Sequence, residues 1–106
     1  MIYRNDLLLA AVRRLNCVHC EIAGRTQAAH SNQLRFGKGR GLKGSDAAIM
    51  ALCHADFGMP GCHAELDQGS HMTKLERYAF EYEHIALTLI ALIEQGYLVV
   101  DKERLK

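Results

Sequence analysis

Four cysteines carry the clearest chemical signature in this chain. Cys17 and Cys20 form a Cys-x-x-Cys turn, and Cys53 and Cys62 follow later. Such a turn lets both sulfurs reach one metal ion, and a second pair completes a tetrahedral zinc site. In a reducing compartment this arrangement favours a metal ion over disulfides. We therefore expect a structural Zn²⁺ bound by all four cysteines, which would stabilise a small domain.

The second cysteine pair leaves alternatives open. Eight residues separate Cys53 from Cys62, where about two to four are usual. His54 could replace Cys53 as a ligand, and His19 could bind from within the first turn. Free cysteines are also common as small buried residues, so Cys53 and Cys62 could simply belong to the core.

A second candidate metal site begins directly after Cys62. His63 and Asp67 are four residues apart, and on a helix they project from the same face. A histidine and a carboxylate, with water and phosphate oxygens at the remaining positions, suit Mg²⁺, Mn²⁺ or a second Zn²⁺. Ordinary surface helices carry such pairs too. The position next to a zinc cysteine is what makes this pair a candidate for a catalytic ion.

His30 and the segment after it suggest a base beside a phosphate-binding loop. A neutral imidazole near pH 7 can take a proton from water, although a structural histidine is the alternative. The loop alternates glycines with cations and has no acid until Asp46. Its basic residues are Arg35, Lys38, Arg40 and Lys43. Glycine amides can approach phosphates while the cations neutralise them, so we predict nucleic-acid backbone binding; a solvated flexible loop is the alternative.

The N-terminal half must position these residues on a helix and a strand. Helical spacing of apolar residues predicts a helix over 6–15, which Asn5 or Asp6 can cap. A strand or hairpin is predicted over 21–30, with a turn at Gly24.

A strand and a short helix are predicted around the second cysteine pair. Glycines exclude a regular element over 31–45, and the apolar run 47–52 is predicted to be a strand. A short helix should begin near Gly61 or Cys62 and end at Gly69.

The last helix has the strongest signals. Thr73 and Glu76 form a capping box, and Gly96 is typical of a helix C-terminus. An edge strand is predicted over 97–100, and a frayed tail over 101–106. Nine apolar residues follow helical spacing and are predicted to face the core: Leu75, Tyr78, Ala79, Tyr82, Ile85, Ala86, Leu89, Ile90 and Ile93. Phe80, Leu87 and Leu92 lie outside this stripe and either extend the buried face or form a dimer contact.

The length of 106 residues indicates one domain, and the predicted helices and strands make it an α+β domain over residues 1–106. It would consist of an N-terminal helix (1–16), a zinc-stapled core (17–69) and a long C-terminal helix (73–96). The chain is 49% hydrophobic and 24% charged, with a net charge of +1, as in soluble globular proteins. Any nucleic-acid contact must therefore come from a local basic patch. No segment resembles a signal peptide or a membrane span, so we expect a cytoplasmic protein without a membrane partner.

The order of motifs resembles the small phage and prophage nucleases of the HNH (His-Me finger, ββα-metal) superfamily, including the YbcO-like group. The matching segments are 17–20, 29–32, 37–46 and 62–69, and the resemblance extends into the last helix. It implies an endonuclease acting on DNA in a host-cell cytoplasm.

The resemblance also implies roles for individual residues. His30 would be the general base, and His63 and Asp67 would bind the catalytic ion. Asp46 would orient the His30 ring, with Asn32 as a weaker candidate. One departure is Ala29, where many superfamily members carry an acidic metal ligand. The rival interpretations are a zinc-stapled nucleic-acid-binding module without catalysis, and a phage adaptor that forms a homodimer through its C-terminal helix.

Overall fold

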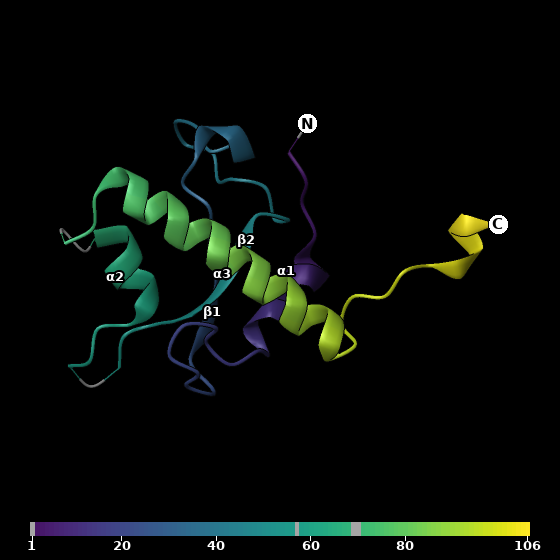
Figure 1. Cartoon of the computed structure of the whole chain (residues 1–106), viewed down its shortest axis with the longest axis horizontal. Helices are drawn as coiled ribbons and strands as arrows, with labels where there is room; N and C mark the ends of the chain where they lie inside the picture. Colours follow the sequence, from purple (N-terminus) through teal and green to yellow (C-terminus); the bar gives the residue numbers. More distant parts are fainter. Residues whose placement is uncertain (1, 57, 69–70) are drawn as a thin grey trace.

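The computed structural model describes residues 2–56, 58–68 and 71–106, as a small α+β domain (Figure 1). Helix α1 (Asp6–Arg13) is followed by strand β1 (Thr26–His30) and strand β2 (Ile49–Cys53). Helix α2 (Cys62–Gln68) precedes the long helix α3 (Lys74–Glu94). Two short 3₁₀ helices, η1 (Leu34–Phe36) and η2 (Lys102–Leu105), complete the described elements. Gly69, predicted to end α2, lies outside the described residues.

The two strands form an antiparallel hairpin at the centre of the domain. Thr26 pairs with Cys53 at one end, and His30 pairs with Ile49 at the other. Every residue of β2 is buried, because α3 packs across it while α1 packs against β1. The hairpin therefore places the cysteine cluster near one end of the sheet and His30 at the opposite end.

The free edge of β2 is covered by two neighbouring segments. The backbone N–H of Ala51 donates to Oγ1 of Thr88 on α3 at 3.0 Å. The Val18 amide, in the Cys-x-x-Cys turn, donates to the Ala51 carbonyl at 2.9 Å. Both hydrogen bonds satisfy backbone groups that point away from β1.

The capping predictions for two helices are confirmed. The Asn5 side chain accepts from the Leu8 amide and begins α1. Oγ1 of Thr73 accepts from the Glu76 amide at 3.1 Å, and the Glu76 carboxylate accepts from the Thr73 amide at 2.9 Å. Gly96, with φ of 83°, follows the end of α3, in the left-handed region where glycine is favoured.

Replacing Thr73 by alanine should lower the free energy of unfolding by about 1 kcal/mol, because the first turn of α3 loses its side-chain acceptor. Thr73→Ser keeps the hydroxyl and should stay close to wild type. Urea titration followed by circular dichroism measures both values. Equal stability of the two variants would contradict the cap's contribution.

The predicted core face of α3 is wrong for most of its residues, although Ile85 packs against the core as predicted. Its buried residues are Glu81, His84, Thr88 and Leu92, whereas Leu75 is 79% exposed and Ile93 is 55% exposed. Polar residues can occupy the buried face because they find hydrogen-bond partners there. Thr88, for example, also donates to the His84 carbonyl at 2.7 Å.

Other boundaries also differ from the sequence predictions. The strand predicted from residue 21 begins only at Thr26, because residues 17–22 close the Cys-x-x-Cys turn, where the Cys17 amide bonds the Ile22 carbonyl. Residues 97–100 are not a strand, since the amides of Tyr97 and Leu98 turn back to Leu92. The tail predicted to fray contains η2. Within the described residues, no helix is both long and apolar enough to cross a membrane.

Candidate functional site

The four cysteines form one cluster, as predicted. Their sulfur atoms all lie within 4.8 Å of one another, and Sγ of Cys20 is 3.6 Å from Sγ of Cys53. Tetrahedral zinc with Zn–S bonds of about 2.3 Å places its sulfurs about 3.8 Å apart. The cluster therefore fits a structural Zn²⁺ bound by Cys17, Cys20, Cys53 and Cys62.

Backbone geometry brings Cys62 to this cluster. Its amide donates to Sγ of Cys53 at 3.3 Å, the type of hydrogen bond that stabilises a thiolate ligand. Gly61 makes the approach possible, because a Cβ there would overlap the Cys53 carbonyl group. The two histidine alternatives point elsewhere: His54 bonds the Ala55 carbonyl, and Nδ1 of His19 lies 3.0 Å from Nε2 of His84.

The thiols of the cluster differ in acidity. Burial opposes ionisation of Cys53, yet the Cys62 amide, the neighbouring thiols and the Arg25 guanidinium lower its pKa to about 7. Burial and the adjacent sulfurs raise the pKa of Cys62. A bound cation would have to displace the protons that these thiols hold.

His63 and Asp67 lie on one face of α2. Nε2 of His63 is 3.1 Å from Oδ2 of Asp67, a spacing that lets both atoms contact one ion at about 2.1 Å. The hydrogen bond with His63 holds the pKa of Asp67 below its usual value, against the effect of burial and with help from Asn32.

Each member of this pair is oriented by an amide side chain. Nδ1 of His63 lies 2.8 Å from Oε1 of Gln27 on β1. With its proton on Nδ1, a neutral His63 would present Nε2 to an ion in place of the hydrogen bond to Asp67, which needs a proton on Nε2. Nδ2 of Asn32 donates to Oδ1 of Asp67 at 3.0 Å. Sequence reasoning missed Gln27 altogether and gave Asn32 a different role.

Asp46 lies against the His30 ring. Its Oδ1 is 2.7 Å from Nε2 of His30, and its Oδ2 accepts from the Asn5 amide at 2.8 Å. Burial alone would raise the pKa of Asp46, but the Asn5 amide, the His30 ring and the Arg4 charge hold it below its usual value. An ionised Asp46 keeps the proton of a neutral His30 on Nε2, and Nδ1 is then free to accept one.

The low pKa of Asp46 predicts how stability depends on pH. A carboxylate whose pKa is lowered by folding stabilises the native state above its unfolded pKa, and this contribution is lost as pH falls through the folded pKa. The stability difference between wild type and Asp46→Asn should therefore shrink as pH falls below about 4. Urea unfolding of both proteins across this range measures it; a constant difference would contradict the assignment.

One cleft gathers His30, His63 and Asp67, whereas Asp46 contacts the His30 ring without lining it. The cleft has a volume of about 280 Å³ and lies between the end of β1, the glycine-rich loop and α2. Seven polar residues line it: His30, Ser31, Asn32, Lys38, Lys43, His63 and Asp67. The two other predicted phosphate-binding cations do not line it, since Arg35 stands over the Tyr82 ring, 6.0 Å from its centroid, and Arg40 is exposed on the loop.

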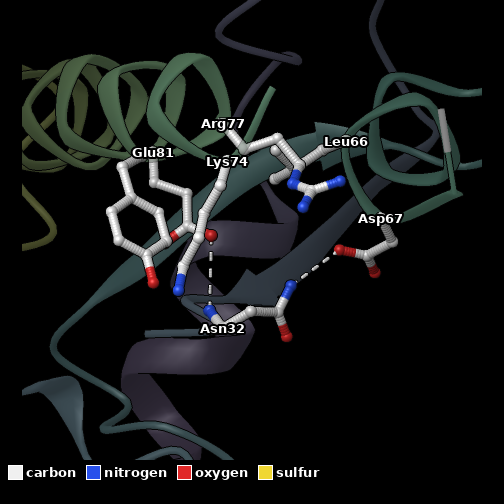
Figure 2. Close-up of a pocket in the computed structure, with 7 residues that line it drawn as sticks. Asn32, Leu66, Asp67, Lys74, Arg77 and Glu81 are labelled. Carbon is white, nitrogen blue, oxygen red and sulfur yellow. Dashed lines mark hydrogen bonds between the residues drawn. The ribbon is translucent and has the colours of Figure 1, made fainter. Parts of the chain in front are cut away.

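A second pocket, of about 340 Å³, adjoins this cleft through Asn32 and Asp67. Lys74 and Arg77, from the first turns of α3, line its other side. Figure 2 shows Asn32 between Asp67 and Glu81, with hydrogen bonds to both.

Glu81 fixes the segment that follows His30. This buried carboxylate accepts from Oγ of Ser31 at 2.5 Å, from Nε2 of Gln33 at 3.2 Å and from the Asn32 amide at 3.3 Å. Three donors offset the cost of burying the charge. Sequence reasoning missed Glu81, because nothing local distinguishes it from the exposed acids Glu76 and Glu83.

Comparisons with protein-family models, with curated proteins and with solved structures found no match. The HNH resemblance therefore stays a prediction from motif order, and any functional assignment must depend on the geometry of the cleft.

Proposed function

We propose that this protein is a metal-dependent endonuclease that hydrolyses DNA phosphodiester bonds. One observation carries the proposal: His30, His63, Asp67 and two lysines line the same cleft, although they come from three separate segments. The order β1, β2, α2 with the cysteine cluster at one end supports the more specific assignment to a zinc-stapled ββα-metal finger of the HNH type.

His30 is the general base in this proposal. Asp46 accepts the Nε2 proton, so Nδ1 takes a proton from a water molecule in the cleft. The water oxygen attacks phosphorus in line and the bond to the 3′ oxygen breaks. The leaving oxygen takes a proton from solvent, so the products carry a 5′ phosphate and a 3′ hydroxyl, and His30 returns its proton to solvent. Asp46 contributes by orienting the ring and stabilising its charged form.

His63 and Asp67 would hold the catalytic divalent ion, Mg²⁺, Mn²⁺ or Zn²⁺. Such an ion supplies charge neutralisation at the phosphate and at the leaving oxygen. Gln27 and Asn32 would keep the two ligand atoms in position, and hydrogen bonds that orient metal ligands typically change metal affinity by about tenfold to a hundredfold.

Lys38 and Lys43 would bind the phosphates on either side of the scissile bond, with Arg35 and Arg40 extending the basic surface. Contacts to phosphates do not read sequence. We therefore propose low sequence specificity, or recognition of a DNA structure such as a junction or a nick, with binding that weakens steeply as salt rises.

Nicking of supercoiled plasmid tests this function. Wild type with Mg²⁺ or Mn²⁺ should nick the plasmid, EDTA should stop it, and His30→Ala should lower the rate at least about a hundredfold. His71→Ala, an exposed histidine outside the cleft, is the matched control. If wild type and His30→Ala are equally inert but both retard DNA on a gel, the protein is a zinc-stapled binding module instead, an alternative supported by the cysteine cluster and the basic loop alone.

A further inference from the structure

Helix α3 exposes a continuous apolar face, which we name the outer face. Its residues are Leu75, Ala79, Tyr82, Ala86, Leu89, Ile90 and Ile93. Leu75 is 79% exposed, Ile93 is 55%, Ile90 is 51% and Leu89 is 49%. Figure 1 shows α3 crossing in front of the sheet, and at Tyr82 this face is bordered by Phe36 and Arg35 of η1. Contiguous exposed apolar surface of this kind marks an interaction site.

The spacing of the outer face is that of a coiled-coil seam. From Leu75 to Ile93 the apolar residues alternate steps of four and three, which places them at the a and d positions of a heptad repeat. The inward face of the same helix already packs on β2. A second helix could therefore dock along the outer face without disturbing the fold.

We propose that the outer face binds a second copy of this chain, with the two α3 helices antiparallel. In the register that places Leu75 against the partner's Ile93, Ala79 meets the partner's Leu89 and Ala86 meets the partner's Tyr82. Four of the six layers then pair a small residue with a large one, which fills space evenly and lets the helices approach closely. A parallel pair would set each alanine against itself and each large residue against itself.

The border of the outer face carries charges of both signs. Glu76, Glu83 and Glu94 lie beside it, as does Lys74, and the Arg35 guanidinium stands over the Tyr82 ring. Charge therefore gives no preference for a nucleic acid or an anionic lipid surface. The self-complementary pattern of large and small residues favours a copy of this chain over an unrelated protein.

The size of the outer face indicates a reversible dimer. The seam spans about 27 Å of helix, at about 1.5 Å per residue. Its exposed side chains offer on the order of 600 Å² per partner, below the ~800 Å² of a standard stable interface. We expect monomer and dimer to exchange at roughly micromolar concentration.

Sedimentation equilibrium of the zinc-loaded full chain over a hundredfold concentration range tests the proposal. Wild type should show a monomer–dimer equilibrium. Ala79→Leu and Leu89→Ala should each weaken dimerisation at least tenfold. Ala79→Leu would place two leucines in the layer that residues 79 and 89 share, and Leu89→Ala would place two alanines there and leave a cavity. The double variant should recover most of the affinity, since each new leucine then meets a new alanine.

Both positions lie outside the core, so circular dichroism should show native helix content in all variants. A wild type that stays monomeric throughout, or a dimer that neither single variant weakens, overturns the proposed interface. Failure of the double variant to recover overturns the antiparallel register. Because no DNA or catalytic ion is used, these results do not depend on nuclease activity.

Discussion

Cys53→Ser should release the structural zinc and unfold the domain. Cys53 is buried in the cluster, where the Cys62 amide and the neighbouring thiols lower its pKa to about 7 against the effect of burial. A structural zinc site contributes about 10 kcal/mol or more to folding. A domain of this size has a total stability of roughly 5–15 kcal/mol, so loss of the ion removes most or all of it.

Two measurements check this result. Wild type should contain one zinc per chain by mass spectrometry, and Cys53→Ser should contain much less and lack a cooperative thermal transition. His54→Ala is the matched control, because it alters the adjacent exposed residue and should keep both zinc and fold. A Cys53→Ser protein with full zinc content and a wild-type transition would contradict the assignment of Cys53 as a ligand.

Removing either His63 or Asp67 should reduce plasmid nicking about a thousandfold or more. A divalent ion contributes several kcal/mol to stabilising charge in phosphoryl transfer, and each 1.4 kcal/mol corresponds to about tenfold in rate. The two side chains would hold one ion, so they act as a unit. The double variant should therefore be scarcely slower than either single variant.

Raising the Mn²⁺ concentration distinguishes loss of one metal ligand from loss of both. Each single variant keeps one ligand and should regain part of its rate as Mn²⁺ is raised, whereas the double variant should not. Glu65→Ala, an exposed acid on the same helix, should nick at the wild-type rate. Single variants that nick normally, with zinc content unchanged, would place catalysis elsewhere.

Local patterns in the sequence were sufficient for several parts of this structure. The capping box at Thr73 and Glu76 depends on residues three apart, and the shared face of His63 and Asp67 depends only on helical geometry. The Cys-x-x-Cys turn predicted the first half of the cysteine cluster, whereas the eight-residue spacer before Cys62 left its second half open. The capping box and the shared face of His63 and Asp67 need no knowledge of distant contacts.

The remaining features depend on partners far away in the chain. Glu81 is buried because Ser31, about fifty residues earlier, donates to it, and no helical periodicity reveals such a donor. Because this contact is not visible in the sequence, the apolar stripe of α3 was assigned to the core. The structure instead buries a more polar face of the helix. Gln27 reaches His63 only through the packing of α2 against the hairpin, which the sequence does not specify.

The outer edge of β2 is covered by the turn that contains Cys17 and Cys20, so the cysteine cluster affects how readily the protein can aggregate. A two-stranded sheet has unpaired backbone groups on its outer side, which can template pairing with another chain. Here the Val18 amide donates a hydrogen bond to the Ala51 carbonyl. Val18 lies in the turn between Cys17 and Cys20, which holds it in place. When the turn opens, an apolar strand edge becomes accessible. A zinc ion bound by the four cysteines would therefore protect the protein against aggregation as well as stabilise its fold.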